Sequence, residues 1–367
     1  MCRFIVCFNE ILENLARVKS KLKKGTKVCA VVKANAYGFG LRKVCSLLQN
    51  SVDYFAVSRL EEFLEYKSYN FKKPCLILTP LSEKQMLIAV KNGAEVTIST
   101  NTNVAYIEKM AKILKLEVKA HIKVDTGMNR FGFKEDAQII NLLKNLKALE
   151  HIKIVGCYSH LHSAENKASS IKQNNRFKEI KNIFNKFNMN PIFHISNSYG
   201  ANNKEYNYDM VRVGFDLYAG ESHKLASKII EVRQIKKGET IGYNASYKAK
   251  KNMLVAVCLG GYADGVRRDL SNRGKVLVGG VKCSIVGNIC MDCFMVDITK
   301  TKNVSVGDEV VIFGKSGENY ISVCEVAKWC DTITYEIYTG LSSRVKRVYR
   351  WRNYASYNRE IQRTKTD

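Results

Sequence analysis

Lys33 stands at the end of a short apolar run, in the stretch AVVKANAYGFG (30–40). A lysine there can extend its ammonium group into water, or it can stay partly buried, which lowers its pKa. A neutral lysine amine is a nucleophile for aldehydes, and enzymes hold pyridoxal phosphate by this chemistry. Tyr37, Gly38 and Gly40 follow in a turn whose glycines let the backbone approach a ligand closely. This context favours the second alternative and indicates a covalent cofactor site.

Eight short runs rich in β-branched residues alternate with amphipathic stretches over residues 1–220. The runs are VCAVV (28–32), YFAVS (54–58), CLILT (75–79), EVTIS (95–99), VKAHIKV (118–124), IKIVGCY (152–158), IFHIS (192–196) and MVRVG (210–214). The stretches between them have the apolar spacing of helices, and several open on Ser, Thr or Asn, as helix N-caps do. The alternation predicts a (β/α)8 TIM-type barrel, with an open doubly wound sheet as the alternative. A barrel carries its chemistry at the carboxyl ends of its strands, where Lys33 lies.

The pattern changes over residues 221–367, where strand-like runs follow one another closely. The runs are SKIIEVRQI (227–235), NMLVAVCLG (252–260), KVLVGGVKCSIVG (275–287), CFMVDIT (293–299) and DEVVIFG (308–314). Glycine and asparagine turns separate them, and one helix-like piece, SVCEVAKWCD (322–331), is interposed. This pattern predicts a second, mostly β domain.

Composition narrows the class of protein. The chain has 367 residues, a net charge of +25 and twelve cysteines. The basic residues are spread along the chain, which favours solvated faces over a nucleic-acid surface; residues 344–363 are the best candidate for the latter. No apolar run reaches the roughly 18–20 residues of a membrane span, and no export signal opens the chain, so we expect a cytoplasmic protein with reduced thiols. Cys290 and Cys293 form a CxxC pair without further ligands at metal spacing, so we expect no metal.

Eight segments, in order, resemble those of the alanine racemase family. They are AVVKANAYGFG (30–40), HIKVDTGMNRFGF (121–133), CYSHLHSA (157–164), HISNSYG (194–200), MVRVGFDLYAG (210–220), IGYNASYKA (241–249), GGYADGVRR (260–268) and GNICMDCFMVD (287–297). The resemblance covers roughly residues 5–350. The family has an N-terminal (β/α)8 barrel and a C-terminal β domain, which agrees with the two patterns found independently above.

The resemblance implies a two-base racemisation of L- and D-alanine on pyridoxal 5'-phosphate. Lys33 would hold the cofactor as an internal aldimine and act as the base on one face of the substrate. Tyr243, supplied by the second subunit of a homodimer, would be the base on the other face. Because tyrosine normally titrates near ~10, His160 and Arg212 would assist it. Arg212 would also face the pyridine nitrogen, and since arginine keeps its proton, that nitrogen would stay unprotonated.

The resemblance also assigns residues that bind the cofactor phosphate and the substrate. Tyr37, Ser198, Gly214 and Phe215 would bind the phosphate, the last two through their backbone N–H groups. Arg130 would bind the substrate carboxylate, and Met291 and Asp292 of the partner subunit would complete that site.

Lys123 lies seven residues before Arg130, and two cations so close would repel each other. The resemblance implies a carbamate on Lys123, which makes its charge negative. The alternative is a lysine paired with Asp125 or Glu135.

The sequence departs from the family at Asn288, where arginine is usual, and at Ser343, where the usual tyrosine touches the phosphate and narrows the site.

From the eight matching segments we read the chain as an alanine racemase that supplies D-alanine for peptidoglycan. The alternatives are a broader serine/alanine racemase and a pyridoxal-phosphate amino-acid decarboxylase of the same architecture; Arg212 argues against the decarboxylase, which would place a carboxylate there. A third alternative is a non-catalytic cofactor carrier. Such carriers lack a second domain, whereas the sequence of this chain predicts one.

Overall fold

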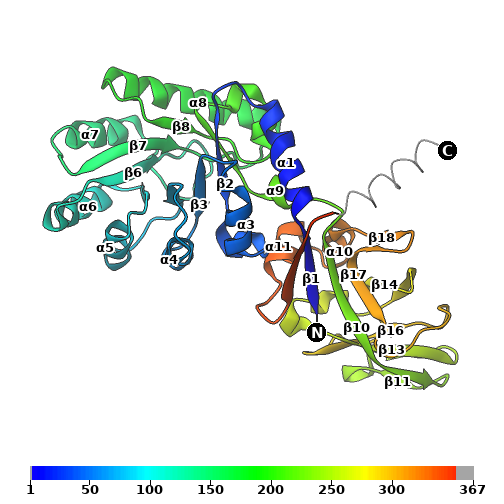
Figure 1. The fold of residues 1–367 in the computed structure, drawn as a ribbon. Coiled ribbons are helices and arrows are strands. Elements are labelled where there is room, and N and C mark those ends of the chain that lie inside the picture. Colours follow the sequence, from blue (N-terminus) through cyan, green and yellow to red (C-terminus); the bar gives the residue numbers. More distant parts are fainter. Residues whose placement is uncertain (1, 353–367) are drawn as a thin grey trace. The chain divides into compact units, whose positions relative to one another are not determined.

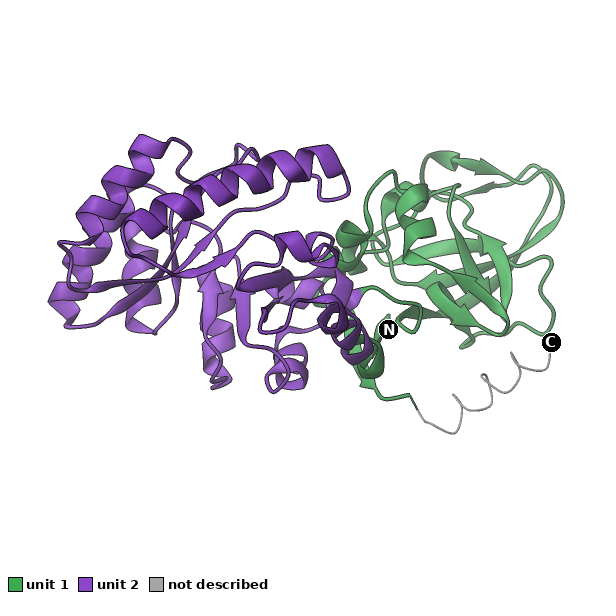
Figure 2. Cartoon of the chain, turned by 90° about the horizontal axis from the view of Figure 1, so that it is seen from above, with its two compact units in different colours: residues 1–11, 219–367 green, residues 12–218 purple. Residues whose placement is uncertain are grey.

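A computed structural model of the chain describes residues 2–352 (Figure 1). The chain forms two compact units: unit 1 comprises residues 1–11 and 219–367, and unit 2 comprises residues 12–218 (Figure 2). Among the described residues, no helix is both long and apolar enough to cross a lipid bilayer. Residues 353–363 of the segment considered above for nucleic-acid binding lie outside the described part of the chain.

Unit 2 contains eight strands that pair only in parallel. They are β2 (Lys27–Val31), β3 (Tyr54–Val57), β4 (Cys75–Ile77), β5 (Val96–Ile98), β6 (Val118–Lys123), β7 (Ile152–Tyr158), β8 (Ile192–His194) and β9 (Met210–Val213). They form two four-stranded sheets, β4-β3-β2-β9 and β5-β6-β7-β8. Glu95 joins β4 to β5 through hydrogen bonds with Ile77 and Cys75, and Arg212 N–H donates to Ser196 O between β8 and β9. The sheets therefore close into the expected barrel.

Helices precede, connect and follow these strands. They are α1 (Phe8–Lys21), α2 (Lys33–Tyr37), α3 (Leu41–Leu48), α4 (Leu60–Ser68), α5 (Glu83–Lys91), α6 (Asn101–Leu114), α7 (Asp136–Leu146), α8 (Lys167–Lys186) and α9 (Phe215–Tyr218). The side-chain oxygens of Ser82, Thr100 and Asn166 cap α5, α6 and α8 by accepting backbone N–H groups of the first turn, which satisfies donors that the helix leaves open.

Unit 1 is mostly β. Its elements are β1 (Arg3–Cys7), β10 (Lys224–Ile235), β11 (Thr240–Ile241), β12 (Tyr247–Lys248), β13 (Met253–Leu259), β14 (Lys275–Val278), β15 (Val281–Ser284), β16 (Cys293–Asp297), β17 (Glu309–Ser316), β18 (Asn319–Ile321), α10 (Val323–Trp329), α11 (Thr334–Thr339) and β19 (Lys346–Arg350). The central strand order is β15-β14-β17-β10-β1-β19, with β13, β16 and β18 attached to it. The mostly β pattern read from residues 221–367 is present here.

Unit 1 also contains the start of the chain, which the sequence placed with residues 1–220. β1 pairs antiparallel with β10 and parallel with β19. Phe4 of this strand is fully buried, and its ring lies 5.9 Å from those of Phe313 and Tyr338. Burial of this apolar run against distant strands explains why residues 1–11 belong to unit 1 rather than to the barrel.

Candidate active site

Lys33 lies two residues beyond the last residue of β2 and begins an unusual turn of unit 2. Ala34, Asn35, Ala36 and Tyr37 all have φ between 52° and 55°, the left-handed conformation that costs a non-glycine residue about 1–2 kcal/mol. The sequence indicated a tight turn around the glycines, but not four consecutive left-handed residues before them. Strain of this kind persists only where neighbouring contacts enforce it, and it concentrates at functional sites.

The contacts that enforce the turn come from α4 and from the turn itself. Ala34 N–H donates to Glu62 Oε1 at 2.7 Å, and Leu41 N–H donates to Asn35 Oδ1 at 2.7 Å. Lys33 is thereby held half-buried. Burial is the largest cause that lowers the Lys33 pKa, and the nearby Arg130 charge lowers it further. Both effects increase the share of neutral, nucleophilic amine.

Tyr37 reaches the loop after β9. A Cβ atom on Gly214 would lie 2.4 Å from Tyr37 Oη, so only glycine permits this approach. The Tyr37 ring lies 5.0 Å from that of Tyr218. Ser198 Oγ accepts the N–H groups of Gly214 (3.0 Å) and Asp216 (3.3 Å), and its own proton remains to donate. The Gly214 N–H, which was expected to bind the phosphate, is therefore donated to Ser198 instead. These hydroxyl and backbone groups form a small cradle at the start of α9. Phe215 is the first residue of that helix.

Arg212 lies on β9 and is 5% exposed. Its Nη1 donates to His194 Nδ1 (2.8 Å) and to His194 O, and its Nη2 shares its two protons among Ser159 O, Ile195 O and His160 Nδ1 (3.3 Å). Among the described residues, its Nε–H has no hydrogen-bond partner and no carboxylate forms an ion pair with it. The guanidinium is thus fixed at two nitrogens and offers the third as a donor.

His160 is the expected companion of Arg212, and the structure brings the two together. Burial lowers the His160 pKa to about 3, and the charges of Arg212, Arg130, Lys123 and Lys33 act in the same direction. The imidazole is therefore neutral. Because its Nδ1 accepts from Arg212, its proton lies on Nε2 and can be donated.

Lys123, at the end of β6, is 3% exposed. Its Nζ donates to Val124 O at 2.6 Å and lies 5.6 Å from the ring centres of Phe131 and Tyr158. Burial lowers its pKa to about 8. Within the described chain, neither Asp125 nor Glu135 forms an ion pair with it: Asp125 accepts from Gly127 and Met128 N–H instead. The ion pair with Asp125 or Glu135 that the sequence left open for Lys123 is therefore not formed.

Arg130 lies in the loop that follows β6. It is exposed, and its guanidinium lies 5.1 Å from the Phe131 ring centre. Its head group is therefore available to an anionic ligand.

Three residues beside Arg212 were missed by the sequence reasoning. Glu95, His121 and His194 are all buried and join Arg212 in one hydrogen-bonded series. The available signal was a histidine inside each of two strand runs, VKAHIKV (118–124) and IFHIS (192–196), together with the glutamate that opens a third, EVTIS (95–99).

The remaining expected residues belong to unit 1. Tyr243 and Met291 are 69% and 52% exposed, which is high for large apolar side chains. Asn288 Nδ2 donates to Tyr243 O (2.9 Å), and Asn288 lies in the loop that carries Met291 and Asp292. The structure thus brings these residues together on one exposed loop cluster.

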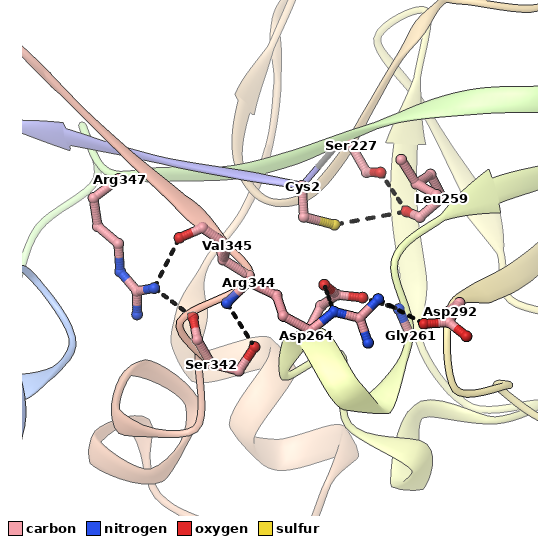
Figure 3. Close-up of polar contacts among 10 residues, drawn as sticks. All are labelled: Cys2, Ser227, Leu259, Gly261, Asp264, Asp292, Ser342, Arg344, Val345 and Arg347. Atoms are coloured by element: carbon pink, nitrogen blue, oxygen red, sulfur yellow. Dashed lines mark hydrogen bonds and ion pairs between the residues drawn. The ribbon is translucent and has the colours of Figure 1, made fainter.

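Arg344 holds the Asp292 end of this cluster. Its guanidinium lies between two carboxylates, 2.6 Å from Asp292 Oδ1 and 3.5 Å from Asp264 Oδ1 (Figure 3). Asp264 in turn accepts the N–H of Gly261 at 3.0 Å. Asp292 is therefore oriented by its own unit.

In the described part of the chain, no group of three or more His, Cys, Asp or Glu side chains is arranged so that it could hold a metal ion. Cys290 and Cys293 face each other across a tight turn, where Cys290 N–H donates to Cys293 O at 2.9 Å, and both are free thiols.

Comparison with known proteins identifies the family. The profile of the alanine racemase N-terminal domain matches residues 6–222, and that of the alanine racemase C-terminal domain matches residues 222–349. The chain belongs to the alanine racemase family. It is 32% identical over 364 residues to alanine racemase of Thermodesulfovibrio yellowstonii, covering 95% of this chain and 98% of that relative.

Solved alanine racemases have the same fold. The enzyme of Clostridium difficile 630 superposes with a TM-score of 0.91 at 32% identity, with 96% of each chain covered. The Bartonella henselae alanine racemase, with covalently bound pyridoxal phosphate, gives a TM-score of 0.85 at 28% identity over 95% of this chain and 99% of that one. The expected family, the barrel with its C-terminal β domain, and an alanine racemase activity are confirmed.

Proposed function

We propose that the chain racemises alanine with pyridoxal 5'-phosphate by two bases, one from each subunit of a homodimer, and so supplies D-alanine for peptidoglycan. One observation carries the proposal: Lys33, with a lowered pKa, shares a strained turn with Tyr37, which reaches the cradle at Gly214 and Ser198. The Bartonella henselae relative, which holds this cofactor covalently, supports it.

The residues present fit a phosphorylated pyridine. Tyr37 Oη, the Ser198 hydroxyl and the N–H of Phe215 would bind its phosphate, because Gly214 leaves room that any Cβ would fill. Arg212 would direct its Nε–H to the ring nitrogen. When bound, the cofactor supplies the electron sink that makes the substrate Cα–H acidic.

The two bases would be Lys33 and Tyr243. Lys33 Nζ would bind the cofactor aldehyde in the resting enzyme and later move a proton on one face of the substrate Cα. The exposed Tyr243 Oη of a second copy would move the proton on the other face. Neutral His160 would donate its Nε2–H to Tyr243 Oη, which stabilises the phenolate that a tyrosine base requires.

Substrate recognition would come from residues of both copies. Arg130 would bind the substrate carboxylate, since its guanidinium is exposed and has no carboxylate partner among the described residues. The backbone N–H of Met291 and the side chain of Asp292, both from the partner copy, would complete the site. Arg344 would keep Asp292 in place.

Reduction with borohydride tests the proposal directly. The purified protein should show cofactor absorbance, and after reduction a pyridoxyl adduct should map to Lys33 by peptide mass. Lys33→Ala should lose the adduct, whereas Lys123→Met, at another buried lysine, should keep it. Racemisation of alanine in heavy water should place deuterium at Cα of both enantiomers. An adduct on any other lysine contradicts the assignment, and release of carbon dioxide favours the decarboxylase.

Lys123 should carry a carbamate. A buried amine whose pKa is about 8 is partly neutral at physiological pH, and a neutral amine can attack carbon dioxide and lose a proton to water. The resulting negative charge would orient Arg130. Protein kept in ¹³C-bicarbonate should give one carbamate carbon resonance that Lys123→Met lacks. An identical spectrum for both proteins would leave Lys123 as an unmodified lysine.

A broader substrate range is the second candidate, and Ser343 supports it. This residue is exposed in unit 1 and replaces a tyrosine that is usual in the family. We expect the protein to racemise serine as well as alanine, and Ser343→Tyr to lower the ratio of serine to alanine kcat/KM by about tenfold. Ser342→Tyr, at the neighbouring position, is the control. Wild-type turnover of alanine with none of serine would refute the idea.

A further inference from the structure

A series of four polar side chains crosses the interior of the barrel. Arg212 Nη1 lies 2.8 Å from His194 Nδ1, His194 Nε2 lies 3.0 Å from His121 Nδ1, and His121 Nε2 lies 2.8 Å from Glu95 Oε2. Both imidazoles are fully buried, and Glu95 is 4% exposed. Burying so many polar groups in a barrel core is costly unless they are paired, and here all four imidazole nitrogens and both Nη nitrogens of Arg212 have hydrogen-bond partners.

The direction of these hydrogen bonds follows from the chemistry of their two ends. Arginine can only donate, so His194 Nδ1 must accept and the His194 proton must lie on Nε2. That proton is donated to His121 Nδ1, so the His121 proton also lies on Nε2 and is donated to the Glu95 carboxylate. Both imidazoles are therefore neutral and share one tautomer. For His194 this agrees with a pKa held well below its usual value by burial and by the charge of Arg212.

The surroundings hold this series in a single arrangement. Gly156 on β7 lies opposite His121, and a Cβ there would be 2.0 Å from His121 Nδ1. The Tyr158 ring stacks on His194 with the ring centres 5.1 Å apart and 13° between the planes. The same ring lies 5.2 Å from the Arg212 guanidinium carbon. Neither imidazole can rotate without displacing buried aromatic or backbone atoms.

We propose that Glu95, His121 and His194 are positioning residues that orient Arg212 and balance its charge. Together with the carbonyls of Ser159 and Ile195 they occupy both Nη nitrogens of Arg212, so its Nε–H points away from the series as a charged donor. Glu95 is the carboxylate that compensates the buried cation, and it acts through two neutral rings. The role assigned to Nε–H, toward the cofactor ring nitrogen, rests on the proposed function.

The wild-type enzyme gives a test that needs no folded variant. In protein labelled with ¹⁵N-histidine, His121 and His194 should each show a protonated Nε2 and an unprotonated Nδ1 in the folded enzyme at neutral pH. Their Nε2 protons should exchange slowly with solvent, since both rings are buried. His151 and His162, which are nearer the surface, provide reference signals. An Nδ1 proton on either buried ring overturns the proposal.

Glu95→Gln tests the charge, because glutamine keeps the shape and an acceptor oxygen but removes the carboxylate. We expect kcat to fall about tenfold while KM for alanine stays within about twofold, and the His121 Nε2 proton resonance to shift. Glu108→Gln is the matched control, since Glu108 Oε1 also bonds a histidine, His151 Nδ1, at 2.9 Å outside this series. Unchanged kcat in Glu95→Gln, or equal losses in both variants, would count against the proposal.

Borohydride mapping separates this proposal from the proposed function. Glu95→Gln should still form the adduct on Lys33, because the residues that would hold the cofactor are unchanged. If the adduct is missing in the wild type as well, the cofactor assignment fails, while the tautomers of His121 and His194 still test the hydrogen-bonded series by itself.

Discussion

A mixture of two inactive variants, Lys33→Ala and Tyr243→Phe, should recover about a quarter of the wild-type racemase activity. Each base is expected to contribute about 10²–10⁴-fold, so each variant alone should be nearly inactive. If each site takes Lys33 from one copy and Tyr243 from the other, a heterodimer has one site with both bases intact. Random exchange makes half of the dimers heterodimers, and half of their sites are complete.

Exchange of subunits must be shown independently, by two affinity tags that purify the mixed dimer. The control is a mixture of Lys33→Ala with the double variant Lys33→Ala/Tyr243→Phe, in which no site can contain both bases. Recovery of activity in the first mixture only would support a shared site. Purified mixed dimers without activity would mean that Tyr243 does not act across the two copies.

Much of the fold could be predicted because its signals are local. Each barrel strand is a short β-branched run followed by an amphipathic stretch, and parallel pairing of neighbouring runs needs no long-range information. The placement of β1 (Arg3–Cys7) could not be predicted in this way. Its partners, β10 and β19, lie more than 200 residues away in sequence, and its short apolar run would suit either unit.

The candidate site was predictable where the family resemblance assigned residues to it. The resemblance implied that Arg212 and His160 act together, and their side chains are hydrogen-bonded. The left-handed turn after Lys33 was not predictable, because alanine and asparagine give no strong signal for φ near 50° and the conformation is imposed by contacts such as the one to Glu62. The roles of the buried histidines depend on which face of a strand each side chain occupies, and strand register decides that.

Gly156→Ala should destabilise the barrel by about 3 kcal/mol or more, although it adds only one methyl group. Gly156 lies directly opposite His121, where the register of β6 and β7 shifts. A Cβ atom there would lie 2.0 Å from Nδ1, 2.3 Å from Cε1 and 2.7 Å from Cγ of a ring with no exposed surface. The ring must move, which adds the cost of overpacking to that of broken buried hydrogen bonds. Denaturant unfolding followed by far-UV circular dichroism measures the loss.

A double-mutant cycle identifies the cause of this loss. Gly156 has no positive φ, so alanine causes no backbone strain, and the cost should arise from the His121 ring alone. In a His121→Ala background that ring is absent, and Gly156→Ala should then cost much less, so that the two substitutions are strongly non-additive. Equal costs in both backgrounds would show that the contact with His121 is not what requires glycine. In that case another neighbour would require glycine at position 156, and other contacts would hold the His121 ring in place.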